Sequence, residues 1–130
     1  MISTMCPFCK FPDSECVQTT TVGRAFRDQY PLSRGHTLVI PRKHVVSLFE
    51  LSTAEQADLW KLVASVREQL QQEFKPDAFN IGVNDGTAAG QTVLHAHVHV
   101  IPRYAGDVPD PRGGVRWIIP EKADYWSKPK

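Results

Sequence analysis

Three histidines at alternating positions are the feature that most restricts how this chain folds. In the segment GQTVLHAHVHVIPR (residues 90–103), His95, His97 and His99 alternate with alanine and valine. Successive side chains of a β-strand point to opposite faces, so the three imidazoles would share one face and the apolar residues the other. A neutral imidazole carries a donor and an acceptor that need partners, which makes three of them a costly core. The pattern therefore predicts a strand with one apolar face and one face that carries chemistry.

The remaining pattern predicts an antiparallel α+β domain. A helix is expected over 53–74, because Ser52 and Glu55 form a capping box and apolar residues recur at helical spacing until Pro76 follows. Strands that precede and follow a single helix favour an α+β arrangement over alternating β/α units. The expected strands are a hairpin over 15–31 turning at Val22–Gly23, 37–40 closed by Pro41, 79–83, 92–101 closed by Pro102, and 115–119.

Length and charge limit the class of protein. The 130 residues suit a single domain over 1–130. The 15 basic residues nearly balance the 14 acidic ones, which argues against nucleic acid or a membrane surface as a partner. No run approaches the ~18–20 apolar residues of a bilayer span, and the N-terminus lacks the layout of a secretory signal. We therefore expect a cytoplasmic protein.

The cysteines lie near the N-terminus. Cys6 and Cys9 form a C-x-x-C pair, and Cys16 makes the number odd. In a reducing compartment such a pair is typical of metal binding or redox chemistry rather than of a structural disulfide.

Two chemistries remain open for the histidine face. An H-x-H pair can bind zinc that activates water, although no Asp or Glu lies between Gly86 and Arg103 to act as the base. Alternatively, one neutral imidazole attacks phosphorus while a second binds the phosphate oxygens. The segment just upstream has amide and hydroxyl donors beside a glycine, a composition suited to binding phosphate oxygens. These residues are Asn84, Gly90, Gln91 and Thr92.

The segment GQTVLHAHVHVIPR resembles the signature of the histidine triad (HIT) family. AFRDQYPLSRGHTLVIPRKH (residues 25–44) is similar to the family's N-terminal segment, VNDG (83–86) to its phosphate loop, and the C-x-x-C pair to its bacterial zinc-carrying members. The likeness covers about residues 6–104 and leaves a tail over 105–130. It implies a HIT-like fold with a five-stranded antiparallel sheet, one long and one short helix, and a homodimer whose sheets join.

The resemblance also implies an activity and roles for individual residues. The family acts on purine nucleotides at the α-phosphate, as hydrolases of dinucleoside polyphosphates or nucleoside phosphoramidates that release a nucleoside monophosphate. Matched by position, His97 is the nucleophile that forms a nucleotidyl-histidine, and His99 binds the α-phosphate. The other nucleotide-binding positions are Asn84, Gln91 and Thr92 for phosphate oxygens, Asp28 for the ribose and Phe26 for the base. Gln91 is also expected to be catalytic, together with His97 and His99.

The zinc-bearing relatives imply a second site. Cys6, Cys9, His44 and His95 match the positions of a closed, structural Cys2His2 zinc site, which would tie the N-terminal segment to the histidine strand.

Some alternatives stay open. Asn84 is shorter than the glutamine of some diadenosine polyphosphate hydrolases and resembles the phosphoramidase branch instead. In the tail, Arg112, Arg116 and Trp117 either grip a distal phosphate or second base, or cover the sheet. A nucleotidyltransferase that passes the nucleotide to a phosphate acceptor, and a weakly catalytic nucleotide-binding protein, are the alternative functions.

Overall fold

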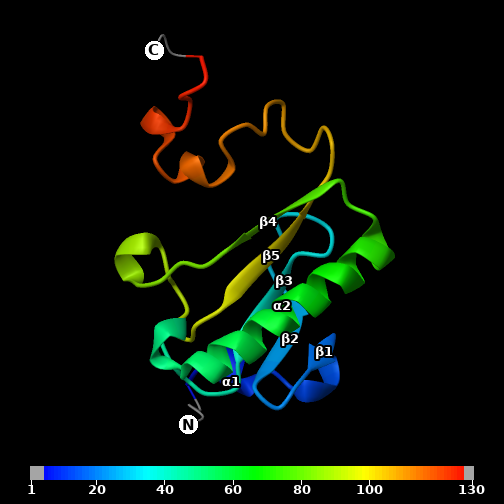
Figure 1. The fold of residues 1–130 in the computed structure, drawn as a ribbon, viewed down its shortest axis with the longest axis vertical. Helices are drawn as coiled ribbons and strands as arrows, with labels where there is room; N and C mark the ends of the chain where they lie inside the picture. The colour runs from blue at the N-terminus through cyan, green and yellow to red at the C-terminus, as the bar shows by residue number, and fades with distance from the viewer. Residues whose placement is uncertain (1–4, 128–130) are drawn as a thin grey trace.

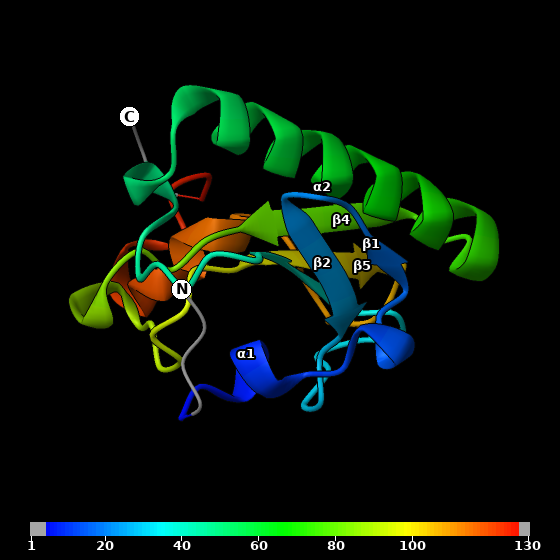
Figure 2. The same ribbon diagram turned by 90° about the horizontal axis from the view of Figure 1, so that it is seen from below.

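A five-stranded antiparallel sheet lies at the centre of the fold, and the computed structural model describes residues 5–127. The first four and last three residues of the expected domain lie outside that range. Figure 2 shows the long helix α2 on one face of the sheet and the short helix α1 on the other. In spatial order the strands are β1 (Gln18–Thr19), β2 (Gly23–Arg27), β3 (Thr37–Pro41), β5 (Val98–Arg103) and β4 (Ala78–Gly82), with helices α1 (Pro7–Lys10) and α2 (Thr53–Phe74) (Figure 1). This confirms the expected α+β fold. No helix within 5–127 combines the length and the apolar character that a membrane crossing needs.

Helix α2 has the predicted bounds, because its signals are local. The Ser52 hydroxyl accepts from the Glu55 N–H at 3.1 Å, and the Glu55 carboxylate accepts from the Ser52 N–H at 2.9 Å. At the other end, Lys75 takes a left-handed conformation at φ 51° just before Pro76, which ends the helix.

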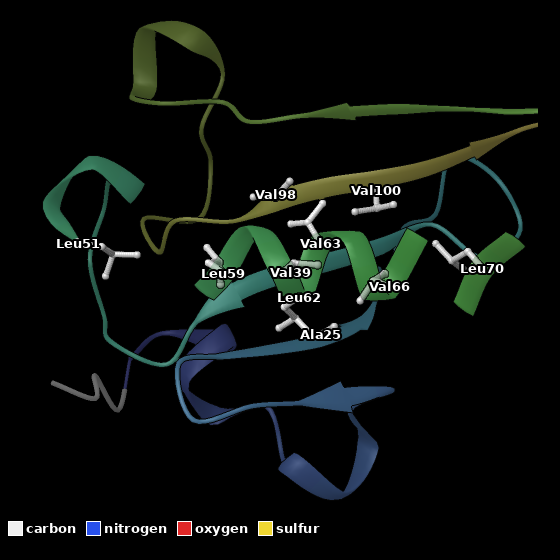
Figure 3. Close-up of a cluster of buried hydrophobic side chains, with 10 residues drawn as sticks. All are labelled: Ala25, Val39, Leu51, Leu59, Leu62, Val63, Val66, Leu70, Val98 and Val100. Atoms are coloured by element: carbon white, nitrogen blue, oxygen red, sulfur yellow. The ribbon is translucent and has the colours of Figure 1, made fainter. Parts of the chain in front are cut away.

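The main core lies between α2 and one face of the sheet (Figure 3). Val98 and Val100, which alternate with the histidines, pack there against the helix. The apolar face of the predicted strand therefore does face the core. Its other members are Ala25, Val39, Leu51, Leu59, Leu62, Val63, Val66 and Leu70.

The prediction for the histidine strand is wrong at both ends. β5 begins at Val98 rather than near residue 92, because the preceding backbone leaves the ladder: Ala96 N–H donates to the Val45 carbonyl instead, at 2.7 Å. It also continues through Pro102, since pairing with β3 has already stopped at Val100 and no ladder donor is needed there. The Pro102 carbonyl on that side accepts from the Ser33 hydroxyl at 2.6 Å.

The prediction of a strand over 115–119 is wrong, because Gly114–Ile118 form a 3-10 helix. Gly113 precedes it at φ 94°, and the Trp117 indole N–H donates to the Arg112 carbonyl at 2.8 Å, so the segment curls on itself. The expected hairpin is present as β1 and β2, with Gly23 N–H donating to the Thr20 hydroxyl at 2.9 Å. Further short 3-10 helices are Asp13–Glu15, Leu48–Glu50, Thr87–Ala89 and Pro120–Lys122.

Candidate active site and metal centre

The residues with reactive or metal-binding side chains lie on the sheet face away from α2 and in the chain just before β5. They form two neighbouring groups of ring nitrogens, thiols and carboxylate. The first group is Cys6, Cys9, His44 and His95, and the second is Asp28, His36 and His99, with His97 beside both.

The first group has the donor set and spacing of a zinc site. The His44 and His95 Nδ1 atoms lie 3.2 Å apart, Cys9 Sγ lies 3.3 Å from His44 Nδ1, and each Sγ lies 3.5 Å from His95 Nδ1. Tetrahedral zinc, with Zn–S of about 2.3 Å and Zn–N of about 2.0–2.1 Å, separates neighbouring ligand atoms by about 3.3–3.8 Å. The four residues could therefore hold a metal ion, and zinc fits them.

The tautomer of His95 also suits a metal ligand. Its Nε2 lies 2.8 Å from the Pro41 carbonyl, which can only accept, so Nε2 carries the proton. The Nδ1 lone pair is then free toward the cysteines. A second ring nitrogen held by a backbone carbonyl is the usual support of a metal-binding histidine.

His97 presents the opposite nitrogen. Its Nδ1 lies 2.8 Å from the carbonyl of His95, so Nδ1–H is the donor and Nε2 keeps its lone pair. The residue is only 7% exposed, and its neighbours hold the ring in place. An imidazole with a fixed proton on one nitrogen is ready to use the other as a nucleophile.

His36 sets the tautomer of His99. Leu32 N–H donates to His36 Nδ1 at 3.0 Å, so His36 carries its proton on Nε2. That proton points at His99 Nδ1, 3.0 Å away, with an oxygen of Asp28 at 3.4 Å. His99 consequently has its own proton on Nε2, where it can be donated to an anion.

The same hydrogen bonds argue against a second metal site at Asp28, His36 and His99. A ring nitrogen that carries a proton cannot be a ligand, and the Leu32 N–H keeps the proton on His36 Nε2. Burial lowers the pKa of His36, and burial together with His97 and His36 lowers the pKa of His99 to about 4. Both rings are neutral near pH 7.

Gln91 lies in the loop before β5 with its side chain fully engaged. Its Oε1 accepts from the Gly86 N–H at 2.9 Å, and its amide donates to the carbonyls of Val46 at 2.9 Å and Val93 at 3.1 Å. The direct phosphate contact predicted from the sequence would require one of these bonds to break. As it stands, Gln91 holds the loop closed.

Asn84 and Thr92 lie in the same loop with unengaged side chains. Within residues 5–127 neither side chain makes a hydrogen bond, and Thr92 is exposed whereas Asn84 is half-buried. Gly86 at φ 103° and Gly90 at φ 100° turn the chain between them. The Asn84 amide and the Thr92 hydroxyl can therefore still donate hydrogen bonds to phosphate oxygens.

An aromatic wall borders the histidines. Phe26 is only 2% exposed, because Phe11 stacks on it at 4.1 Å between centroids and Phe8 meets it edge-on at 5.5 Å. Phe8 also lies edge-on to His97 at 5.1 Å. The half-buried rings of Phe8 and Phe11, rather than the buried Phe26, therefore offer apolar surface beside His97.

Sequence reasoning missed His36, Phe8 and Phe11. His36 was visible only as a histidine flanking a strand, and Phe8 and Phe11 as the spacer and neighbour of the C-x-x-C pair. Asp28 does lie at the site, where one oxygen accepts from the Tyr30 N–H at 2.8 Å.

The tail arginines are engaged within the tail. The Arg112 guanidinium lies 4.8 Å from the Trp126 ring and pairs with Asp110 at 2.9 Å. Arg116 lies 4.7 Å from the Tyr125 ring. Figure 1 shows this segment on the side of β4 away from β5.

Comparison with known proteins gives one consistent result. A family model described as HIT domain matches residues 12–106. A bis(5'-nucleosyl)-tetraphosphatase (asymmetrical) from Schizosaccharomyces pombe is 43% identical over 101 residues, covering 77% of this chain and 56% of that protein. A bis(5'-adenosyl)-triphosphatase from Saccharomyces cerevisiae is 35% identical over 98 residues, covering 74% and 44%. The chain thus spans about half the length of these two relatives.

A solved structure shares the fold over most of both chains. It is a zinc-bound histidine triad family protein from Mycobacterium smegmatis, 32% identical, with a TM-score of 0.71 over 91% of this chain and 93% of that one.

Proposed function

This chain belongs to the HIT domain family, and on that premise we propose that it is a nucleotide hydrolase that works through a covalent bond to His97. The observation that supports the proposal most is the pair of fixed tautomers. His97 has a free Nε2 lone pair, and His99, whose ring centroid is 5.1 Å away, has an Nε2–H donor. One ring can attack while the other binds the charge that develops.

The reaction takes two displacements. In the first, His97 Nε2 attacks the α-phosphorus and the bond from phosphorus to the leaving group breaks. A leaving phosphate departs with the electron pair on oxygen, and a leaving amine takes a proton from solvent as its P–N bond breaks. The His95 carbonyl keeps its bond to Nδ1–H while that ring becomes positive. In the second, water attacks phosphorus, loses its proton to solvent, and the P–N bond to His97 breaks to release a nucleoside monophosphate.

The surrounding residues would hold the nucleotide. His99 Nε2–H donates to an α-phosphate oxygen, and Asn84 and Thr92 bind others from the loop. Asp28 is proposed to bind the ribose hydroxyls. Phe8 and Phe11 supply the apolar wall for a purine base.

We assign the metal group a structural role. Cys6, Cys9, His44 and His95 would hold zinc, which when bound cross-links the N-terminal segment to the start of β5. Four protein ligands complete a tetrahedral shell, so no position is left for a reacting water. This favours attack by histidine over attack by metal-bound hydroxide.

The substrate class follows from the relatives and the loop. The matched yeast proteins are named for cleavage of dinucleoside tetra- and triphosphates, so these are the first candidate substrates. Asn84 resembles the residue of the phosphoramidase branch, so nucleoside phosphoramidates are the second class of candidate substrate.

His97→Ala tests the proposal. We expect kcat to fall about 10³-fold or more on diadenosine tetraphosphate and on adenosine phosphoramidate, because the nucleophile is gone. Denaturation curves check that the variant still folds. Labelled substrate, quenched in acid-free medium after a short reaction, should leave nucleotide on the wild-type protein alone. Wild-type turnover by His97→Ala would rule out the covalent mechanism.

A further inference from the structure

Residues 6–11, called the hook, supply two of the four side chains of the metal group, Cys6 and Cys9; the other two are His44 and His95. Cys6 caps the short helix α1, where Cys9 N–H donates to Cys6 Sγ at 3.4 Å, and the two sulfurs each lie 3.5 Å from His95 Nδ1. His44 and His95 meet them from the chain after β3 and from the start of β5. Metal bound here would fix the hook on these segments.

The hook also carries two rings beside the proposed nucleotide site. Phe8 lies between the two cysteines in sequence and touches the ring of His97, and Phe11 stacks on Phe26. Phe8 also lies 6.0 Å from His95, edge-on. One short segment therefore contacts the metal group and the nucleophile together.

Arg24 fastens the hook to the sheet. Its guanidinium donates to the carbonyls of Phe8 and Phe11, and it pairs with Asp13 at 3.2 Å. The Arg24 side chain is only 7% exposed, and its bonds to the two carbonyls are part-buried and charge-assisted. Arg24 and Phe26 lie on the same face of β2. The bonds from Arg24 to the two carbonyls, called the clamp, therefore lie beside the ring on which Phe11 stacks.

We propose that Arg24 is a positioning residue that makes the hook a single unit, so that metal binding and nucleotide binding favour each other. The inference rests on the proposed nucleotide function. Each ligand needs the hook docked with the Arg24 bonds formed, so whichever binds first bears the cost of ordering that arrangement and the second binds more tightly. Without the clamp, the cysteines and the phenylalanines could order separately.

Linkage makes the proposal quantitative. The factor by which metal raises nucleotide affinity must equal the factor by which nucleotide raises metal affinity, and couplings of this kind are typically about 5–150-fold. The equality holds for any mechanism, so the size of the factor and its loss when the hook is altered are what test the proposal.

The experiment measures both affinities with AMP and Zn²⁺ as probes. Calorimetry gives the affinity of AMP for zinc-loaded and for metal-free protein, the latter prepared with a chelator under reducing conditions. Competition with a zinc-binding dye gives zinc affinity with and without saturating AMP. We expect the two factors to agree and to exceed about fivefold. Equal AMP affinity in both metal states would overturn the coupling alone, whereas no AMP binding in either state would overturn the proposed function as well.

Arg24→Gln tests the clamp, with Arg42→Gln as the matched control. Arg42 pairs with the same Asp13 and donates to the Thr20 carbonyl, but makes no bond to the hook. Arg24→Gln should lower zinc affinity about 10–100-fold, as loss of an outer support of a metal site does, and bring the coupling factor near one. Arg42→Gln should change neither. Wild-type zinc affinity and coupling in Arg24→Gln would contradict the role.

Phe8→Ala covers the case in which Arg24→Gln does not fold. This variant keeps all four ligands and the clamp but removes the ring that touches His97. Zinc affinity in the absence of AMP should stay near wild type while the coupling factor falls toward one. Full coupling in Phe8→Ala would show that the hook does not link the two sites.

Discussion

Backbone groups decide, one nitrogen at a time, where the protons of the active-site histidines lie. A carbonyl can only accept and an amide can only donate, so His95 O fixes His97 and Leu32 N–H fixes His36. His36 then fixes His99 through a bond of 3.0 Å between the rings. The result is a lone pair on His97 Nε2 and a proton on His99 Nε2, both set by hydrogen bonds to neutral groups.

His36→Leu should lower kcat about 10²-fold with a smaller change in KM, because His99 loses the donor that keeps its proton on Nε2. His36→Gln, whose amide can still donate to His99 Nδ1, should recover a large part of the loss. Steady-state kinetics give the split between kcat and KM, and nitrogen NMR of the ring reports the His99 tautomer. Equal losses in both variants with an unchanged tautomer would contradict the relay.

At the scale of residues, the sequence predicted which side chains belong to the site better than it predicted the contacts that each one makes. The alternation of His95, His97 and His99 pointed to a chemical face, and the C-x-x-C pair to a metal. The relay through His36 could not be predicted, because it joins residues 63 positions apart through ring nitrogens. Gln91 was expected to touch phosphate, yet its side chain holds the loop, which only the position of Val46 reveals.

Among the elements, those with local signals were predicted and those shaped by distant contacts were not. Helix α2 matches its capping box and its periodicity residue by residue. The start of β5 does not, because His95 is drawn out of the pleat toward Pro41 and the cysteines, which lie far away in sequence. The tail was misassigned because two glycines and its own arginines curl it.

The turn before β3 gives a prediction at the scale of elements. Gly35 has φ 94°, and a Cβ there would lie 2.8 Å from the ring of Phe74 and 3.1 Å from Leu70, at the end of α2. Gly106 has φ 84° with open space around it. Gly106→Ala should cost about 1–2 kcal/mol of unfolding free energy from backbone strain alone, and Gly35→Ala about 1–3 kcal/mol more from the clash.

Denaturant titration of the two variants measures these costs side by side. A loss in Gly35→Ala no greater than in Gly106→Ala would mean that the packing of α2 against this turn tolerates the added methyl group.

Across the whole molecule, one face of the sheet stabilises the fold and the other carries the chemistry. Burial on the second face disfavours the protonated form of its imidazoles, so the free energy of unfolding depends on pH. The pKa of His99, about 4, lies below its ordinary value of about 6.5. Between those values the unfolded chain binds more protons than the folded one, so the free energy of unfolding falls as pH falls from about 6.5 to 4.

Denaturation at a series of pH values should therefore show stability loss beginning near pH 6.5, before carboxylates titrate. His99→Asn should flatten the curve in this window relative to wild type, because the titrating ring is gone. Comparing the two proteins in the same metal state removes the contribution of the cysteine group. Parallel curves would contradict the assignment.

The open edge of the sheet bears on assembly. β4 is an outer strand that pairs only with β5 within the described residues, and its other edge offers backbone donors and acceptors. We expect two copies to join along it, as the family resemblance implies. Light scattering should give twice the 14.6 kDa mass of one chain, and a single-chain mass throughout the micromolar range would contradict this.

His95 serves both centres with different parts of itself: the imidazole faces the cysteines, and the carbonyl holds His97. Every amino acid has that carbonyl, so a change of side chain at position 95 would leave an acceptor for His97 Nδ1–H in the chain. Substitutions could erase the metal site over the history of such a chain without removing the group that orients the nucleophile.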